Sequence, residues 1–413
     1  MSPSNDAQEA TPHANSDPTA EEASSSEPSL EIDVPWQNEQ SDERDSAFGD
    51  TQSSYTMSAT SSVFSFRYEN GRRYHAYAEG MYPVPNDETE ADRLDLQHHA
   101  FRLTLDGKLY RAPISENVQS VLDVGCGTGI WAIEFADEHP SARVLGTDLS
   151  PIQPEQVPPN CEFLIDDCEK EWIFHDKFDY IHSRALVAAI KNWPRFFEQA
   201  YDNLNPDGYL ECQDIAFPIR CMDTNVTAQD SPLIRWSEYF IEAAQKIGLD
   251  GTGPRHFTPQ LRDAGFTDIH VKMYKWPVGK WAKGARFKLL GHFVYEDLMD
   301  WLPSSSLGLF TRILKWSREE VEVFLADCRQ EAKRKDRHYY ADVFFWYARK
   351  PKNAKQSTHT NDVVHEEESI HCDETDYAQD PSSFAKPATS VDTKETKSSQ
   401  HPQSPTKSII SLK

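Results

Sequence analysis

Hydrophobic positions between residues 118 and 216 alternate between two patterns. Short runs of five to seven mostly apolar residues predict buried strands, and the segments between them repeat apolar positions at helical spacing. Strands separated by helices predict a parallel sheet with right-handed crossovers, so we expect an α/β fold. The predicted strands are Ser120–Val124, Arg143–Asp148, Cys161–Asp166, Phe178–His182 and Gly208–Asp214, and the predicted helices are Ile130–His139 and Trp193–Leu204.

The pattern is looser on both sides of this core. Residues 87–110 predict one or two helices ahead of it, and the aromatic-rich segment from Ser62 to Tyr82 is expected to dock on the folded body. Residues 217–338 predict helical insertions, and we expect their part over 278–336 to cover the mouth of the active site. The predicted elements are the helices Leu233–Ile247, Thr258–Ala264, Lys283–Trp301 and Ser317–Lys335, the strand Thr267–Trp276 and a final strand over 339–349.

Composition limits the folded part to the middle of the chain. Residues 1–60 hold 13 acidic residues and one basic residue, and residues 351–413 hold ten acidic and seven basic residues. Such segments bury too little apolar surface to offset their ordering entropy, so we predict disorder for residues 1–62 and 351–413. The folded domain is then residues 63–350, with a core over 118–216.

Charge and cysteine usage exclude several classes of protein. The formal net charge of −25 argues against direct binding to nucleic acid, which needs basic patches. We find no apolar run of membrane-spanning length and no secretory signal, so neither a membrane helix nor secretion is expected. The seven cysteines form no Cys-x-x-Cys pair, so we expect neither a metal site nor a disulfide framework. These features predict an intracellular protein.

The stretch from Val121 to Gly129 (Val-Leu-Asp-Val-Gly-Cys-Gly-Thr-Gly) carries the clearest chemical signal. Its glycines follow a predicted strand and precede a predicted helix, so the backbone can turn sharply and approach a ligand without a Cβ clash. The spacing Gly-x-Gly-x-Gly after an aspartate is typical of loops that bind S-adenosylmethionine (SAM). The expected SAM contacts in this loop are Asp123, Gly125, Cys126, Gly127, Thr128 and Gly129.

Acidic residues end the next two predicted strands. Asp148, which Leu149 follows, lies about twenty residues after the loop, where a carboxylate can accept both ribose hydroxyls. Asp166 and Asp167 end the third strand, where a side chain typically contacts the adenine amino group in SAM enzymes, and we favour Asp167. Each acid alone could be a solvated loop residue or a helix N-cap. Together, at strand ends that border the ligand crevice of an open α/β sheet, they predict SAM as the cofactor.

Two other nucleotide-binding classes fit less well. NAD binding is the nearest alternative, but dinucleotide-binding loops have the spacing Gly-x-Gly-x-x-Gly, and the preceding Asp123 also argues against it. A nucleoside triphosphatase is excluded because no Gly-Lys-Ser/Thr follows the glycines.

The sequence does not fix the catalytic group. His182 ends the fourth predicted strand and is a candidate base, although a strand-end histidine is more often held by backbone hydrogen bonds. Asp214 ends the fifth strand and could orient a substrate or cap the next loop. Aromatic residues of the insertions would suit an apolar acceptor, but at helical spacing they are more often core. They are Trp236, Tyr239, Phe240, Trp276 and Trp281.

Several motifs of this chain resemble those of the fungal LaeA-like methyltransferases. They are Leu122–Asp148, the segment Ser150–Pro154 (Ser-Pro-Ile-Gln-Pro), Phe178–Arg184, Trp193-Pro194, Gly208–Glu211, and, ahead of the core, Glu69–His75 and Asp92–Asp95. The resemblance covers about residues 65–350. It implies a class I SAM-methyltransferase fold, a Rossmann-like sheet of seven mostly parallel strands with the last strand antiparallel. It also implies that Asn70–Tyr74 lie near the cofactor mouth.

The resemblance implies a fungal origin and leaves two classes of function open. One is an enzyme that methylates a small molecule, an oxygen or a carboxylate of a secondary metabolite. The other is a SAM-binding regulator of secondary metabolism and development that acts through velvet-type protein partners. The long acidic head and the Ser/Pro-rich tail favour the second, because disordered arms bind partners. The nucleus is the suspected compartment, with the cytoplasm as the alternative.

Overall fold

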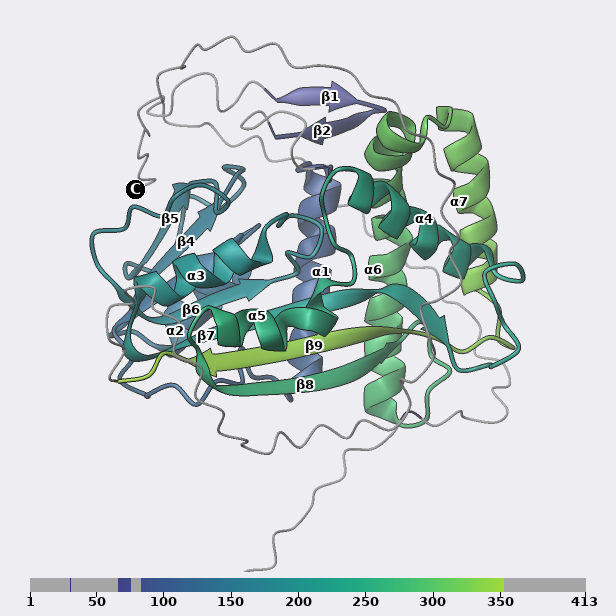
Figure 1. Cartoon of the computed structure of the whole chain (residues 1–413). Helices are drawn as coiled ribbons and strands as arrows, with labels where there is room; N and C mark the ends of the chain where they lie inside the picture. The colour runs from purple at the N-terminus through teal and green to yellow at the C-terminus, as the bar shows by residue number, and fades with distance from the viewer. Residues whose placement is uncertain (1–29, 31–65, 76–82, 353–413) are drawn as a thin grey trace, which may run out of the picture.

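The computed structural model of the chain describes Leu30, residues 66–75 and residues 83–352. The disorder predicted for residues 1–62 and 351–413 concerns segments almost wholly outside these residues, so it stays a prediction. Within the described part, the α/β fold is confirmed: one large sheet carries helices on its faces, and a group of helices stands at one end (Figure 1).

The central sheet has the strand order β5-β4-β3-β6-β7-β9-β8. Neighbours from β5 to β7 are parallel, whereas β9 is antiparallel to both β7 and β8. This confirms seven mostly parallel strands with the last strand antiparallel. The strand order reverses at β3, and an open sheet of this kind binds ligands at that point, beyond the carboxyl ends of its strands. The strands are β3 (Ser120–Val124), β4 (Arg143–Asp148), β5 (Cys161–Ile165), β6 (Phe178–Arg184), β7 (Leu204–Cys221), β8 (Thr267–Pro277) and β9 (Tyr339–Arg349).

Strand β7 is longer than its hydrophobic pattern predicts. The sequence predicts a strand that ends at Asp214, but β7 continues to Cys221, where it pairs with Tyr339 of β9. It also begins at Leu204, so the predicted turn after helix α3 (Trp193–Asn203) is an irregularity within the strand. The partner strand β9 determines both ends, and a partner so distant in sequence leaves no trace in a local pattern.

The helices fall into two groups. The core crossover helices are α2 (Ile130–Glu138) and α3, with α5 (Phe257–Asp263) packed against α3, and Figure 1 shows α3 and α5 together on the near face of the sheet. The second group stands at the end of the sheet where α1 packs along α6. Its members are α1 (Glu88–Thr104), α4 (Pro232–Lys246), α6 (Ala285–Leu309) and α7 (Arg318–Ala332).

Helix α6 corrects the predicted boundary at Trp301. It runs through Pro303 to Leu309 and continues as a π-helical turn, Phe310–Leu314. A proline inside a helix removes one backbone hydrogen bond, but here every residue from Ser304 to Leu309 is buried, which offsets that loss. In α7, the capping box predicted by the Ser317–Glu320 spacing is present, with both reciprocal hydrogen bonds formed.

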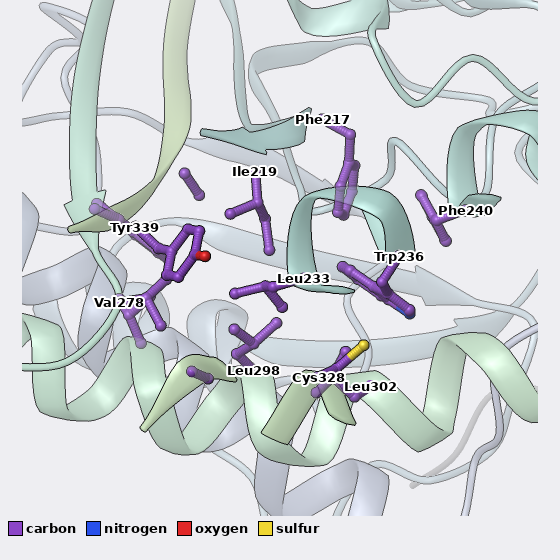
Figure 2. Close-up of a cluster of buried hydrophobic side chains, with 14 of the residues drawn as sticks. Phe217, Ile219, Leu233, Trp236, Phe240, Val278, Leu298, Leu302, Cys328 and Tyr339 are labelled. Carbon is purple, nitrogen blue, oxygen red and sulfur yellow. The ribbon is translucent and has the colours of Figure 1, made fainter. Parts of the chain in front are cut away.

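Apolar side chains from the helical group and the end of the sheet form one large core cluster. Figure 2 shows Trp236 and Phe240 of α4 packed among residues of β7, α6 and α7. Both side chains are buried, as is Trp276 on β8, whereas Tyr239 and Trp281 are half-buried at the margins of clusters. Trp236 and Phe240 are therefore core residues, and of the five aromatic lid candidates only Trp276 faces a cavity described below.

A short hairpin, β1 (Arg67–Glu69) and β2 (Arg72–Tyr74), precedes α1. Asn70 and Gly71 form its turn with φ values of 53° and 81°, the positive pair that a two-residue type I′ turn requires. The Asn-Gly pair is typical of such a hairpin, although the sequence analysis predicted only that this segment docks on the folded body and lies near the cofactor mouth.

Candidate functional site

The glycine loop between β3 and α2 turns through three residues with positive φ, Gly125 at 67°, Gly127 at 56° and Gly129 at 81°. A Cβ at Gly129 would lie 2.4 Å from the ring of Phe163, so a side chain is excluded there on steric grounds as well as by the backbone conformation. Gly129 also serves as the N-cap of α2. The loop therefore presents backbone, rather than side chains, at the carboxyl end of β3.

Four hydrogen bonds fix this loop. The N–H of Cys126 donates to the Thr147 carbonyl at 2.9 Å, and the N–H of Gly127 donates to Asp148 Oδ2 at 2.9 Å. Gln153 Nε2 donates to the Gly127 carbonyl at 2.6 Å. Thr128 Oγ1 donates to Asp95 Oδ1 at 2.6 Å, which ties the loop to α1.

Asp148 lies where the sequence predicts a ribose-binding carboxylate, at the end of β4. Its two oxygens accept from the N–H groups of Gly127 and Ser150, both at 2.9 Å. Burial raises the pKa of Asp148 to about 6, against the lowering effect of these two hydrogen bonds. Backbone N–H groups of Gly127, Leu149 and Ser150 interact with a carboxylate that has about four acceptor positions, so Asp148 can still accept a hydroxyl group of a ligand.

Asp166, rather than Asp167, lies on the same side of the strand ends as Asp148. Asp148, Leu149 and Asp166 line one cavity at the carboxyl ends of the strands. The carboxylate of Asp167 instead accepts from the Glu169 N–H at 3.1 Å and lies 3.6 Å from Lys170 Nζ. The geometry thus favours Asp166 for an adenine contact, against the preference stated from the sequence, because adjacent residues at a strand end point in opposite directions.

Asp123 and His182 form a buried pair on neighbouring strands. His182 Nδ1 lies 2.8 Å from Asp123 Oδ1, and the imidazole stacks on Trp131 of α2 with ring centroids 3.7 Å apart. The partner of this strand-end histidine is thus a carboxylate, not the backbone. His182 lines a cavity that is formed with Asp123 and the glycine loop. It does not line the neighbouring apolar cavity that contains Asp214. His182 is therefore better placed to hold Asp123 than to accept a proton from a substrate in the apolar cavity.

Three adjoining cavities follow the carboxyl ends of the strands. We name them after the roles proposed for them below: the adenosine pocket, lined by Asp148 and Asp166, the sulfonium pocket, lined by Asp123 and the glycine loop, and the acceptor pocket, which is mostly apolar. Leu94 and Ala185 line all three. The cavities are therefore successive parts of one cleft.

The acceptor pocket spans about 750 Å³, a volume that includes space open to solvent, and contains two kinds of polar group. Arg93 and Asp297 pair with each other, with Nη1 and Oδ1 2.6 Å apart. Asp214 accepts backbone N–H groups of Leu186 and Ile215, both at 2.9 Å, and makes no ion pair with the described residues. Burial raises the pKa of Asp214 to about 8, against the effect of these hydrogen bonds. Asp214 thus both caps the loop after β6 and faces the cavity.

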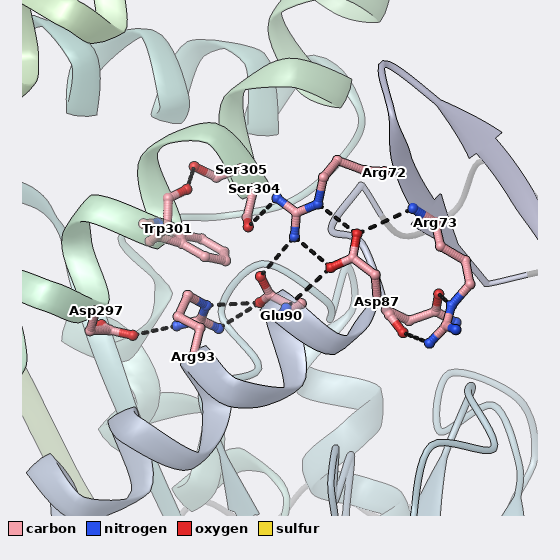
Figure 3. Close-up of polar contacts among 10 residues, drawn as sticks. Arg72, Arg73, Asp87, Glu90, Arg93, Asp297, Trp301, Ser304 and Ser305 are labelled. Carbon is pink, nitrogen blue, oxygen red and sulfur yellow. Dashed lines mark hydrogen bonds and ion pairs between the residues drawn. The ribbon is translucent and has the colours of Figure 1, made fainter. Parts of the chain in front are cut away.

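A network of hydrogen bonds and ion pairs joins α1 to the hairpin and to α6 (Figure 3). Arg72 of the hairpin donates two hydrogen bonds to Asp87, the N-cap of α1, from Nε at 2.6 Å and from Nη2 at 2.8 Å. One turn on, Glu90 accepts from Arg93, which reaches Asp297 of α6. The hairpin motif predicted near the cofactor mouth therefore acts through α1, whose residues Glu90 and Leu94 line the adenosine pocket.

The sequence interpretation missed α1 as part of the site. Its apolar positions predict a core helix, but the structure brings Leu94 and Gln97 to the cleft wall. It likewise missed Arg184, which lines both the adenosine and sulfonium pockets. Among the described residues, none of the helices is long and apolar enough to cross a membrane, and no cluster of His, Cys, Asp and Glu could hold a metal ion.

The strand order and the glycine loop at the switch point define a class I methyltransferase. A family model described as a methyltransferase domain matches residues 96–271. "Methyltransferase pytC" of Aspergillus terreus is 40% identical over 303 residues, 73% of this chain and 93% of that protein. The chain belongs to the LaeA-like family of SAM-dependent methyltransferases.

Other relatives in the family carry different names. "Secondary metabolism regulator LAE1" of Cochliobolus heterostrophus is 35% identical over 291 residues, 68% of this chain and 94% of that protein. "Protein-methionine methyltransferase laeA" of Emericella nidulans is 34% identical over 290 residues, 69% of this chain and 77% of that protein. Among solved structures, Haemonchus contortus phosphoethanolamine N-methyltransferase 2 in complex with SAM matches 63% of this chain and 52% of that chain, with 19% identity and a TM-score of 0.36.

Proposed function

We propose that this chain binds SAM along the adenosine and sulfonium pockets and transfers its methyl group to a small, apolar molecule in the acceptor pocket. The continuity of the three pockets at Leu94 and Ala185 carries this proposal, because it lets the reactive end of the cofactor meet an apolar cavity. Bound SAM supplies an electrophilic methyl group on a sulfonium.

The residues present fit this cofactor. Asp148 would accept a hydrogen bond from the ribose hydroxyls, and Asp166 would accept one from the adenine amino group. Gly127 keeps a narrow part of the cleft free of a side chain, because a Cβ there would approach Leu94 to 3.3 Å. Positioning of two reactants in this way supplies much of the rate acceleration in such transfers.

The acceptor pocket favours a neutral molecule with a hydroxyl group. Its cation, Arg93, is already neutralised by Glu90 and Asp297, so the pocket offers no free positive charge to a substrate carboxylate. We propose Asp214 as the base that takes the hydroxyl proton while the acceptor oxygen forms its new bond to the methyl carbon and the carbon–sulfur bond breaks. Its position in the pocket outside the Arg93 network supports this assignment.

The test combines binding with labelling. We expect S-adenosylhomocysteine (SAH) to bind the full chain in isothermal titration, and Gly127→Arg to abolish binding, because the new side chain fills the sulfonium pocket. Incubated with methyl-labelled SAM and an extract from a strain that lacks this gene, the wild type should label an organic-soluble small molecule and Gly127→Arg should not. Equal titrations for the two proteins would contradict the cofactor site.

A regulator that binds SAM but acts through protein partners is the second candidate. The relatives named regulators of secondary metabolism support it. On this alternative we propose velvet-type proteins as partners and the nucleus as the compartment. Label confined to protein, together with stable co-purification of such partners, would favour this candidate over the small-molecule enzyme.

A further inference from the structure

Arg184 ends β6 at the point where the adenosine and sulfonium pockets join, and it lines both. Its guanidinium forms no hydrogen bond or ion pair with any residue in the described part of the chain, and its carbon lies 5.1 Å from the centre of the buried Phe101 ring. The contrast with Arg93 is direct, since that guanidinium makes hydrogen bonds with two carboxylates. Arg184 is therefore a cation held in place without an anion.

The carboxylates nearest to Arg184 in charge interaction are Asp123, Glu134 and Asp95. Each has another partner: Asp123 accepts from His182, Asp95 from Thr128, and Glu134 contacts His98 and Arg102. None of them neutralises Arg184 at contact distance. Burial lowers the pKa of Arg184 to about 10, so the side chain still carries its charge at neutral pH.

A buried charge without a partner is costly, and the cost is removed if a ligand supplies the missing anion. The proposed function brings one such group into this region, because the amino-acid end of SAM carries a carboxylate and extends from the sulfonium centre. A guanidinium matches a carboxylate with two parallel hydrogen bonds. Arg184 does not line the acceptor pocket, so a carboxylate of the acceptor is not the expected partner.

We propose that Arg184 binds the carboxylate of the amino-acid end of SAM and makes the protein selective for ligands that carry it. This inference rests on the proposed function. It assigns Arg184 a binding role, distinct from the ribose contact proposed for Asp148.

The test compares two ligands that differ only in this carboxylate, SAH and its decarboxylated form, by isothermal titration against the full chain. For the wild type we expect SAH to bind about 100-fold more tightly, the effect of losing one partner of a buried charge pair. For Arg184→Gln we expect SAH binding to weaken by about the same factor, while the decarboxylated ligand binds at least as well as before, because its ammonium no longer meets an unpaired guanidinium.

Asp148→Asn is the matched control, since it alters the opposite end of the cofactor site and should weaken both ligands by the same factor. Arg184→Lys, which keeps the charge but loses the planar fork, should retain part of the selectivity. Loss of affinity for both ligands in Arg184→Gln, or an unchanged ratio of the two dissociation constants, would overturn the inference and leave the proposed function standing. A wild type that binds neither ligand would refute the proposed function itself.

Discussion

At the scale of single residues, the motif Ser150–Pro154 is explained by one side chain. Gln153 Nε2 donates to the carbonyls of Gly127 and Ser150, at 2.6 and 3.0 Å, and so joins the glycine loop to the segment after β4. The backbone conformation that leaves room for a ligand is thereby fixed from outside the loop. A residue of a motif that resembles those of the LaeA-like methyltransferases thus holds the glycine loop in place.

Gln153→Ala should weaken SAH binding by about threefold to tenfold, the effect of one lost hydrogen bond. We expect little change in the melting temperature, because the loop keeps its contacts to Thr147 and Asp148. Gln119→Ala is the control: that side chain also donates to two backbone carbonyls, but at the opposite end of β3. If both variants bind SAH like the wild type, Gln153 does not order the loop.

The position of Asp214 in the acceptor pocket predicts how the rate of methyl transfer depends on pH. Its pKa is raised to about 8 by burial, so a base at this position is mostly protonated at pH 7 and the rate of methyl transfer should rise with pH and level off above about 8. Asp214→Asn should lower the rate by about 100-fold or more and remove this dependence.

The measurement uses the acceptor found by labelling, with SAH titration to show that the variant still binds the cofactor product. Asp223→Asn, at an acid outside the cleft that pairs with His338, should keep the wild-type profile. A flat profile in the wild type would argue against Asp214 as the base, as would be expected for an acceptor that loses no proton.

At the scale of elements, α1 shows why the sequence singled out the glycine loop and the strand-end acids but not the other residues that line the cleft. The glycine spacing is a local signal, readable within nine residues. In α1 the apolar positions Leu94, Leu96 and Leu103 are only half-buried, whereas Glu90 and Arg93 are buried through ion pairs. Arg93 also pairs with Asp297 of α6, and Glu90 with Arg72 of β2. Because these partners lie outside the helix, the pattern within α1 does not predict that Glu90 and Arg93 are buried.

Asp87→Ala tests how the hairpin holds α1. The change removes both the N-cap of the helix and the partner of Arg72, so we expect a loss of about 2–4 kcal/mol in the free energy of unfolding. SAH binding should weaken too, since α1 carries Leu94 and Glu90 of the cleft wall. Glu88→Ala, whose side chain is 84% exposed, should cost less than about 0.5 kcal/mol. Denaturant titrations measure the free energy of unfolding of both variants. Equal losses in the two variants would mean that the pair Arg72–Asp87 does not hold the helix in place.

At the scale of the whole molecule, the order of strands and helices was predictable because each strand is a short apolar run with its own boundaries. The predicted boundaries are wrong at the extension of β7 along β9 and at the passage of α6 through Pro303, because distant segments meet there. The acceptor pocket is lined by residues of β7, β8, β9, α1, α6 and the loop after β6, so no single stretch of sequence predicts it.

Cofactor binding should therefore stabilise the molecule as a whole. SAH at about 100 times its dissociation constant adds about 2.7 kcal/mol to the free energy of unfolding, which we expect as a rise of several degrees in melting temperature. Hydrogen exchange should slow most in α1 and the glycine loop and least at the edge strand β8, away from the adenosine and sulfonium pockets. Slowing confined to the glycine loop would show that α1 does not close on the ligand.

The contact between Arg93 and Asp297 can form only late in the synthesis of the chain. The two residues are 204 positions apart, and a ribosome adding about 5–20 residues per second needs about 10–40 s to pass from one to the other. Late in that interval the glycine loop and the first strands have been made, while α1 still lacks the helix that it packs along. A nascent chain of this protein cannot complete its acceptor pocket until α6 emerges, so chaperones have an interval in which to bind α1.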